Sequence, residues 1–345
     1  MYGSVRKKRS RLHIGAALLL ALCFCAGVPA QATAPTMKAS AAPRMLVPVG
    51  HTVGIKLFAR GVLVVKLSEG GTPAKSCGLQ TGDVIVQCGG VSVTSTEQFQ
   101  ALLQKNGGTE TDLQVRREGR NLTLSVEPKA TQDGAYGIGA WVRDSMAGIG
   151  TMTYYDPSSG NFGALGHGIT DVDTSQLLPF STGSILPSTV KALRKGAAGE
   201  AGELRGNFDL SQDLGALSAN TDRGIFGTLD PRHQPEQCKG ALPVAKRSEL
   251  HAGPAEIRAN VRGDEVAAYQ VEILKVTPRA ADGRELLISI TDPALLEQTG
   301  GIVQGMSGSP ILQDGKFVGA VTHVLLNDPT RGYGISMETM LEAAE

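Results

Sequence analysis

From Met45 onward, the apolar residues of the chain fall into short runs that are bounded by glycine, proline and other turn residues. Representative runs occupy residues 53–57, 62–67, 113–115, 122–126, 255–261, 269–276, 286–291 and 317–324. They are rich in β-branched side chains and too short for typical helices, so they predict strands. Helical character is expected only at residues 73–77, 95–103, 188–195 and 337–344. Because strands do not alternate with long helices, the sequence predicts a mainly β chain rather than a parallel α/β sheet.

Composition narrows the possible classes of protein. A length of 345 residues suggests two or three domains, at roughly 100 to 200 residues each. With 44 glycines and 19% charged residues, the chain is too apolar for disorder and too rich in glycine for a helical bundle. Basic and acidic residues balance at 33 each, so the chain has no overall positive field, and nucleic-acid binding is not expected.

The N-terminal segment has the pattern of an export signal. Several basic residues and no acidic residue precede an uncharged apolar stretch at 14–29, and small residues follow at 30–34. The stretch is shorter than the roughly 20 residues that span a bilayer, so we expect residues 1–34 to be a cleaved signal peptide and the mature chain to act outside the cytoplasm. The alternative is a retained anchor that associates transiently with a membrane. Residues 35–44 lack periodicity and read as a linker.

Residues 45–128 carry two segments that resemble a PDZ domain: the glycine-bearing strand VGIKL at 53–57 and the stretch AKSCGLQTGDVI at 74–85. PDZ-like modules add an extended peptide as an extra strand, and amides of a glycine loop bind its terminal carboxylate. The resemblance therefore implies that Gly54, Ile55 and Leu57 bind a peptide or a C-terminal segment of a partner. The alternative is a folded spacer without a ligand.

Metal and cofactor chemistry is not expected. The chain has no HExxH, no CxxC and no cluster of His and Cys residues, which are the patterns of zinc sites. Cys77 and Cys88 lie within apolar runs and read as small buried hydrophobic residues. Cys238 is the third cysteine after the predicted signal, so at least one of the three has no partner within the chain.

The hexapeptide GMSGSP at 305–310 is the most informative motif for chemistry. It resembles the GDSGGP signature of chymotrypsin-like serine peptidases. A tight turn of this kind exposes a serine hydroxyl and directs two backbone N–H groups toward one point, an oxyanion hole. Ser307 is the predicted nucleophile, and the N–H groups of Gly305 and Ser307 are the predicted oxyanion donors. Ser309 aligns with the second glycine of the signature and is not expected to react.

A serine hydroxyl needs a neighbouring base. Five histidines follow the predicted signal: His51, His167, His233, His251 and His323. His167 is flanked by glycines at the end of a strand, where its ring can project into a cleft, and it is the predicted base. The alternative is a histidine buried for packing. His323 follows an apolar strand at a position that indicates packing.

The acid that orients the base is less well marked. Asp292 ends the strand at 286–291 and stands fifteen residues before Ser307, which keeps the chain order His, Asp, Ser. Asp171 and Asp173 lie close to His167 in sequence, but a role in a local turn is expected for them. Asp292 is therefore the predicted acid.

Several longer segments are similar to the stage IV sporulation protein B family. They occupy residues 142–153, 163–174, 224–228, 300–310 and 320–324. The resemblance covers about residues 45–345 and implies a PDZ domain at 45–128 followed by a chymotrypsin-like double β-barrel peptidase domain at 135–345. Carried onto this chain, it assigns Ser307 as nucleophile, His167 as base and Asp292 as acid. Gly168 stands where a bulkier apolar residue is expected, a difference that would loosen the turn.

The same resemblance implies a biological role. Members of the family are exported serine endopeptidases that signal between compartments of a developing endospore, in the space between forespore and mother-cell membranes. They cut themselves and a membrane-bound regulatory complex, which releases an intramembrane metalloprotease that matures a late sigma factor. Two alternatives stay open from the residues alone. One is an inactive peptidase fold that docks membrane proteins through its PDZ-like part, and the other is a peptidase with a lysine base.

Overall fold

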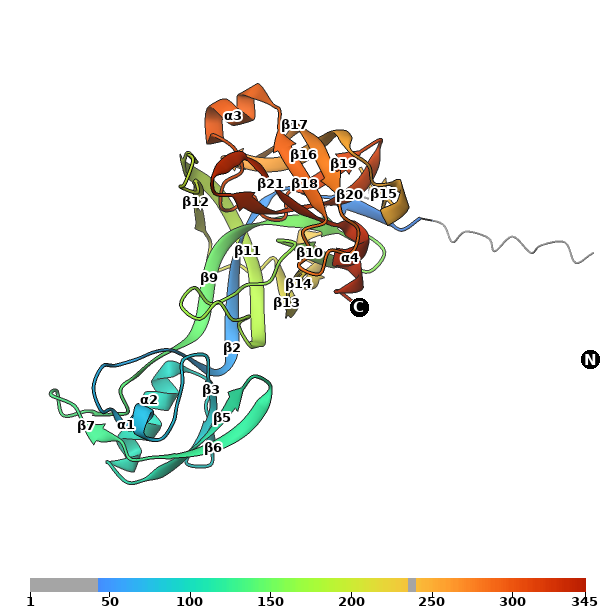
Figure 1. The fold of residues 1–345 in the computed structure, drawn as a ribbon. Helices are drawn as coiled ribbons and strands as arrows, with labels where there is room; N and C mark the ends of the chain where they lie inside the picture. The colour runs from blue at the N-terminus through green and yellow to red at the C-terminus, as the bar shows by residue number, and fades with distance from the viewer. Residues whose placement is uncertain (1–42, 235–239) are drawn as a thin grey trace, which may run out of the picture. The chain divides into compact units, whose positions relative to one another are not determined.

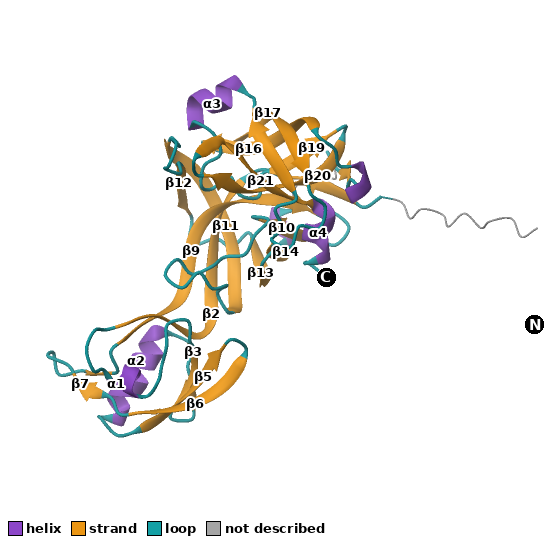
Figure 2. Ribbon diagram, viewed as in Figure 1, coloured by secondary structure: helices purple, strands orange, loops and turns teal. Residues whose placement is uncertain are grey.

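The computed structural model describes residues 43–234 and 240–345. The predicted signal at 1–34, most of the predicted linker and Cys238 lie outside these residues. The described chain is mainly β, with four short α-helices, as Figure 2 shows. Residues 188–195, expected to be helical, instead lie mostly within strand β11 (Phe180–Arg194), which pairs with three other strands. No helix in the described ranges is long and apolar enough to cross a membrane.

Six strands close the first barrel. In order around the ring they are β2 (Thr52–Leu67), β9 (Ala140–Tyr155), β10 (Asn161–Ala164), β14 (Gly224–Leu229), β13 (Gly215–Thr221) and β11, and pairing of β11 with β2 completes it. Its core contains Ile55, Leu57, Phe162, Ile185 and Ile225. At its margin, β1 (Met45–Pro48) pairs with β9 and with β15 (Leu242–Pro243), and β12 (Glu203–Phe208) pairs with β11.

The second barrel is closed by strands from the C-terminal third of the chain. They are, around the ring, β16 (Gly253–Arg262), β17 (Glu265–Val276), β18 (Leu286–Ile290), β21 (Asp328–Ser336), β20 (Lys316–Leu325) and β19 (Pro310–Gln313). Alternating apolar residues of these strands fill the interior, among them Ile257, Ile273, Ile288 and Val321. Helix α3 (Pro293–Thr299) connects β18 toward β19, and short 3-10 turns occupy Pro231–His233 and Arg247–Glu249.

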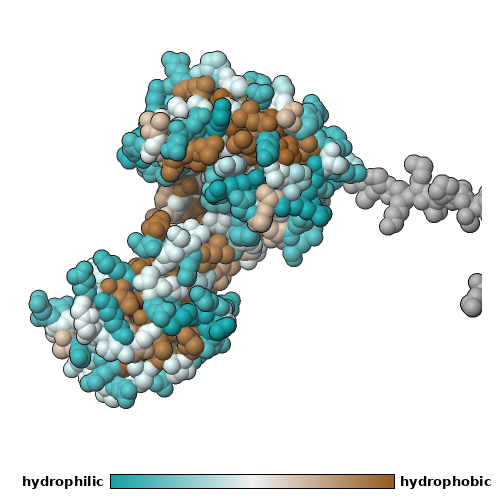
Figure 3. Space-filling model, in the orientation of Figure 1, coloured by the Kyte–Doolittle hydropathy of each residue, from teal (hydrophilic) through white to brown (hydrophobic). Residues whose placement is uncertain are grey.

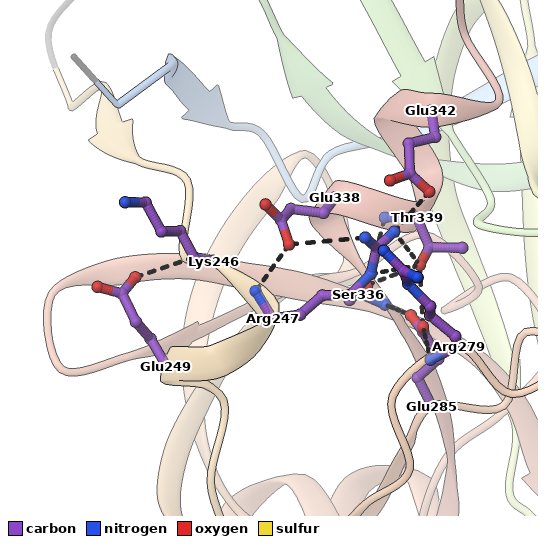
Figure 4. Close-up of polar contacts among 9 residues, drawn as sticks. All are labelled: Lys246, Arg247, Glu249, Arg279, Glu285, Ser336, Glu338, Thr339 and Glu342. Atoms are coloured by element: carbon purple, nitrogen blue, oxygen red, sulfur yellow. Dashed lines mark hydrogen bonds and ion pairs between the residues drawn. The ribbon is translucent and has the colours of Figure 1, made fainter. Parts of the chain in front are cut away.

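A buried carboxylate anchors the C-terminal helix α4 (Met337–Glu342) to the second barrel. Glu285 is 1% exposed and accepts hydrogen bonds from the N–H groups of Arg279 and Ser336 and from the hydroxyl of Thr339. Arg247 adds ion pairs to Glu338 and Glu342 of α4. Figure 4 shows how these groups converge. Because every polar group of Glu285 has a partner, the network holds the loop before β18 in place.

The PDZ module is inserted into the first barrel rather than preceding it. It comprises α1 (Pro73–Ser76), β3 (Val84–Cys88), β4 (Val91–Ser92), α2 (Thr96–Asn106), β5 (Thr111–Arg117), β6 (Arg120–Val126), β7 (Lys129–Ala130) and β8 (Tyr136–Gly137). The second half of β2 and the first half of β9 complete it, and both strands continue into the barrel, as the blue and green ribbons of Figure 1 show. Residues 45–58 therefore belong to the barrel, which corrects the predicted module boundary at Met45.

The module's own core explains two further sequence features. Its interior contains Val62, Ile85, Phe99, Leu113 and the predicted small hydrophobe Cys88. Cys77 is half-buried, packs against the same core and has a free thiol, as has Cys88. Burial raises the pKa of the Cys88 thiol, so this cysteine is a packing residue and a poor nucleophile.

Candidate active site

Ser307 lies on a turn between α3 and β19 that only glycine can form on either side. Gly305 has φ +100° and Gly308 has φ +98°, in the region that disfavours a side chain. A Cβ at Gly308 would also lie 2.2 Å from the carbonyl oxygen of Thr151. The turn is fixed by main-chain bonds from Gly308 N to Val321 O and from Ser309 N to Met306 O. Ser309 itself is fully buried, in keeping with the expectation that it does not react.

The two predicted oxyanion donors are free in the structure. Within residues 43–234 and 240–345, neither the N–H of Gly305 nor that of Ser307 donates to a protein acceptor. Ser307 is half-buried, and its Oγ donates to the carbonyl oxygen of Thr322 at 2.9 Å. The turn thus offers a hydroxyl and two unused amide donors, the groups that an acyl-transfer reaction needs.

His167 follows a sharp reversal of the chain at the end of β10. Leu165 and Gly166 both have φ +70°, and at Leu165 this conformation is strained, at a cost of order 1–3 kcal/mol. The reversal carries the imidazole away from the first barrel's core, where Leu165 itself is buried. Gly168 fits tightly, since a Cβ there would lie 2.3 Å from the Leu177 side chain. Glycine at this position is therefore required by packing and does not loosen the turn, contrary to expectation.

The protonation of His167 follows from its surroundings. Its Nδ1 lies 2.8 Å from the carbonyl oxygen of Gly168. A proton on Nδ1 donates to this oxygen and leaves Nε2 as an acceptor, the tautomer that a general base requires. Burial lowers the pKa of His167 below 6.5, so the ring is neutral at pH 7.

One threonine connects the serine turn to the histidine turn. Thr151 of β9 is buried, and its N–H donates to Ser307 O at 3.0 Å while its Oγ1 donates to Gly305 O at 2.7 Å. Its carbonyl oxygen accepts the N–H of Leu165 at 3.2 Å. Since these bonds join loops from two barrels, Thr151 sets the relative position of the predicted nucleophile and the predicted base. No motif in the sequence marks Thr151.

The loop after His167 is held by a side chain of β13. Asn220 Oδ1 accepts from Ile169 N at 2.9 Å, and its Nδ2 donates to Ile169 O at 3.0 Å and to Leu178 O at 3.3 Å. The amide therefore imitates a strand ladder across the two ends of this loop. Sequence alone offered no signal for Asn220, because it lies 53 positions from His167 in an ordinary strand.

His167 and Ser307 line one cavity of about 790 Å³, together with Gly305, Thr322 and His323. No hydrogen bond joins His167 to Ser307 in the described chain, and the Ser307 hydroxyl donates to Thr322 O instead. The His323 ring stands 5.3 Å from the His167 ring, centroid to centroid. Loss of hydration and the neighbouring His167 and Arg284 lower the pKa of His323 to about 4.

His323 lines the cavity with part of its surface open to solvent and is not the packing residue that the sequence indicated. A signal was available. The motif at 305–310 leads into β19, and the short turn at Asp314–Gly315 returns the chain along β20, with Pro310 opposite Ala320. Because the two strands run antiparallel, His323, three positions after Ala320, is expected to lie close to Ser307, three positions before Pro310.

Asp292 is not brought to His167. It is the N-cap of α3, where its carboxylate accepts from Leu295 N at 3.0 Å and from Gln270 N at 3.3 Å, and it does not line the cavity. Helix α3 leads directly into the serine turn, so Asp292 is connected to the site through this helix. The role of Asp292 as the acid stays a prediction. The carboxylates that line the cavity are Asp222 and Asp282, and no sequence motif marks either of them.

Asp171 and Asp173 lie on the loop after His167. Asp171 is fully buried, and its Oδ1 accepts the N–H groups of Asp173 and Thr174, which is the turn role expected from the sequence. Both carboxylates pair with Arg143 of β9. These contacts lower the pKa of Asp171 against the opposing effect of its burial, which is the largest single influence.

The predicted peptide-binding residues are wrong. Gly54, Ile55 and Leu57 lie in β2 within the first barrel, where Ile55 pairs with Ile185 on one side and with Gly148 on the other. Ile55 and Leu57 are buried in the barrel core. A strand with both edges paired has no free N–H and C=O groups for a peptide. The segment has the sequence pattern of a PDZ peptide-binding strand, but in the structure it is a strand of the first barrel.

A double barrel with a serine on a glycine turn and a histidine in the same cavity defines a serine peptidase of the chymotrypsin-like type, here with an inserted PDZ module. The family model described as SpoIVB peptidase S55 matches residues 134–341, and a PDZ domain model matches residues 64–117. The chain belongs to the SpoIVB peptidase S55 family and is a serine peptidase, and its PDZ domain implies peptide binding.

Curated relatives match short stretches of the chain. The zinc metalloprotease RasP of Oceanobacillus iheyensis is 39% identical over 57 residues, 16% of this chain and 13% of that protein. The serine protease HTRA1 of Xenopus tropicalis is 41% identical over 58 residues, 17% of this chain and 12% of that protein. The chain thus spans less than a quarter of the length of the curated relatives it matches.

Two solved structures show partial similarity. The PDZ domain of an SdrC-like protein from Listeria monocytogenes is 21% identical, with a TM-score of 0.22, and the match covers 24% of this chain and 87% of that one. The inactive form of the Rv3671c protease is 12% identical, with a TM-score of 0.32, and the match covers 56% of this chain and 81% of that one.

Proposed function

We propose that this protein is an exported serine endopeptidase that signals during endospore formation by cutting itself and a membrane-bound regulatory complex. One observation carries the catalytic part: Ser307 and His167 share a cavity beside two amide donors that have no protein partner in the described chain. Membership of the S55 family supports the sporulation part. The export part rests on the sequence pattern of residues 1–34.

The chemistry follows from these groups. Rotation of the Ser307 side chain away from Thr322 O turns Oγ toward Nε2 of His167, which takes the hydroxyl proton as Oγ bonds to the scissile carbonyl carbon. The N–H groups of Gly305 and Ser307 stabilise the resulting oxyanion, and Gly168 O stabilises the proton on Nδ1 of the imidazolium. His167 then gives its proton to the leaving amine as the C–N bond breaks. Water next attacks the acyl-enzyme, His167 takes a proton from that water, and the same proton passes to Ser307 Oγ as the ester bond breaks.

A serine-reactive phosphonate tests the catalytic part. The purified protein is treated with the reagent and digested, and the adduct is located by mass spectrometry. We expect modification of Ser307 in the unaltered chain and none in Ser307→Ala, whose fold is preserved because the hydroxyl contributes little burial. Modification of another serine, with Ser307 unlabelled, would contradict the assignment.

A second candidate is an inactive peptidase fold that docks membrane proteins. The bond from Ser307 Oγ to Thr322 O favours it, because the hydroxyl does not contact the base. Mixing the unaltered protein with an excess of Ser307→Ala chain separates the two candidates. We expect new N-termini in the Ser307→Ala chain, found by terminal sequencing. An intact Ser307→Ala chain, together with an absence of phosphonate labelling, would favour the docking function.

A further inference from the structure

Strand β9 presents an open edge that leads from the PDZ module to the catalytic cavity. One edge of β9 pairs with β2 along residues 140–151. On the other edge, pairing begins only at Met152, where β10 joins. Within the described chain no strand covers that edge at Ala140–Arg143. Further along, residues 146–149 line the cavity that holds Ser307 and His167.

The module frames this edge as a place for a peptide. Hydrogen bonds connect both ends of helix α2 to the segment that contains the open edge. At its N-terminal end, Thr96 N donates to Asp144 of β9 at 2.8 Å. Near its C-terminal end, the Gln104 side chain bonds the backbone N–H and C=O of Tyr136. Between these ties stands the glycine turn at 137–139. Among described residues, the N–H groups of Ile138 and Gly139 donate to no protein acceptor. Unused amides beside an open strand edge suit an extended peptide that ends in a carboxylate.

Arg143 connects the same edge to the histidine loop. It is the last residue of the open stretch paired with the module half of β2, opposite Leu63. Its guanidinium forms ion pairs with both Asp171 and Asp173, four and six positions after His167. Two ion pairs from one guanidinium, one of them to the buried carboxylate of Asp171, hold the loop in position better than a single exposed charge contact. Eight residues further along the same strand, Thr151 bonds to both catalytic turns.

We propose that β9 couples peptide binding in the PDZ module to the catalytic histidine. An extended peptide with a free carboxyl end adds to the edge at Ala140–Arg143 and places its carboxylate on the amides of Ile138 and Gly139. It thereby fixes the backbone of Arg143, and through Arg143 the loop that follows His167. The relevance to turnover rests on the proposed peptidase function, but the structural coupling is measurable without catalysis.

The binding arm uses Trp141, the single tryptophan of the chain, which lies in the proposed edge with 63% of its surface exposed. The probe is a pool of acetylated hexapeptides, randomised at five positions and ending in valine with a free carboxylate, added to the Ser307→Ala protein. We expect saturable change of the Trp141 fluorescence. The same pool with an amide terminus is expected to bind at least about tenfold more weakly. Failure of the free-acid pool to alter the fluorescence overturns the proposed surface.

The coupling arm measures hydrogen exchange of residues 165–178 with and without the free-acid pool. We expect peptide to slow exchange there in the Ser307→Ala protein and to leave it unchanged when Arg143→Gln is added, although Trp141 still reports binding. Arg120→Gln is the matched control, because Arg120 is exposed on β6 of the same module. Peptide binding without slower exchange, or an equal response in the Arg143→Gln protein, overturns the coupling.

Two further measurements keep the outcomes separate. If the Arg143→Gln protein does not fold, Asp173→Asn removes one of the two ion pairs at a half-exposed carboxylate, and we expect a reduced response. In the unaltered chain, peptide should change the rate of phosphonate labelling at Ser307 by about fivefold or more. Absence of labelling, with the exchange response intact, refutes the peptidase function and leaves the coupling standing. A labelling rate at Ser307 that does not change when peptide is bound refutes the link between peptide binding and catalysis.

Discussion

The serine turn and the histidine loop are built in different ways. Main-chain hydrogen bonds and two glycines with positive φ fix residues 305–309, which are buried except for Ser307. The loop from 168 to 178 is closed by main-chain bonds of its own, but the side chains of Asn220 and Arg143 tie it to neighbouring strands, and its Val172 is 79% exposed. A packed turn is hard to rearrange, whereas an exposed loop that side chains tie to the neighbouring strands opens at lower cost. The backbone of the serine turn is therefore preformed, and backbone adjustment of the site falls to the histidine loop, although the Ser307 hydroxyl must still rotate away from Thr322 O.

The surface around this loop agrees with that contrast. Figure 3 shows apolar residues interspersed with polar ones on the face it draws. Val172, Leu177 and Leu326 are large apolar side chains that are exposed in the described chain. Two of them belong to the histidine loop, and Leu177 also lines the cavity. An exposed apolar loop beside a catalytic cavity is suited to contact with a substrate.

Replacement of the base has the largest expected effect. His167→Ala should lower kcat by about 10³-fold or more, because the hydroxyl loses its proton acceptor. His323→Ala is the control, since its ring shares the cavity but has no assigned proton transfer, and it should retain most of the turnover. Peptide-cleavage kinetics measure both. Unchanged cleavage by His167→Ala would favour the alternative with a lysine base.

Thr151 tests whether the two turns depend on one residue. Thr151→Val removes the bond to Gly305 O and leaves that carbonyl buried without a partner, at about 1–3 kcal/mol in the free energy of unfolding. We expect kcat to fall at least about tenfold with a folded protein, as judged by denaturant unfolding and peptide cleavage. Thr151→Ser keeps the hydroxyl and should restore most of the loss. Equal behaviour of the two variants would show that the hydroxyl has no positioning role.

Asn220 tests the histidine loop alone. Asn220→Ala removes three hydrogen bonds to Ile169 and Leu178, so hydrogen exchange should rise at 168–178 and stay unchanged at 305–309. The free energy of unfolding should fall by about 1–2 kcal/mol, since bonds at a partly buried amide are only partly replaced by water. A matching rise of exchange in the serine turn would break the distinction between the two regions.

Asp292 separates a cap from a catalytic acid. If it acts through α3, Asp292→Ala should lower the free energy of unfolding by about 1 kcal/mol, and Asp292→Asn, which still caps a helix, should lose little. Turnover should follow the same order, because α3 leads into the serine turn. An Asp292→Asn protein that is stable yet about 10⁴-fold slower would instead support the acid of the triad.

The pH dependence has the smallest expected effect. The folded-state pKa of His167 lies below 6.5 and that of His323 is about 4, so between about pH 4 and 6.5 these two histidines bind more protons in the unfolded chain than in the folded one. The free energy of unfolding should therefore rise with pH in this window. The acid limb of kcat/KM should have its midpoint below 6.5. His323→Gln should flatten the stability curve, and a stability that falls across this window would contradict both shifts.

Much of the molecule could be predicted from local patterns. Short β-branched runs between turn residues indicated a mainly β fold, and the motif at 305–310 marked Ser307 because its glycines meet a local backbone demand. The glycines around His167 indicated in the same way that this residue lies in the cavity of Ser307, where the structure places it. These features depend on conformations that a few neighbouring residues determine, so a local pattern carries them.

Contacts across long distances in sequence were decided only by the tertiary structure. The strand at 53–57 has the pattern of a peptide-binding PDZ strand, yet pairing with β9 and β11 buries Ile55 in a barrel. Asn220 acquires its role from partners 42 and 51 positions away, and Thr151 from partners 14 to 156 positions away. Asp292 becomes a helix cap rather than a contact of His167. The sequence thus determined which local turns and strands form. The tertiary structure decided which strands pair with one another. A strand's own residues do not specify its neighbours, so pairing depends on burial and hydrogen bonding over the whole chain.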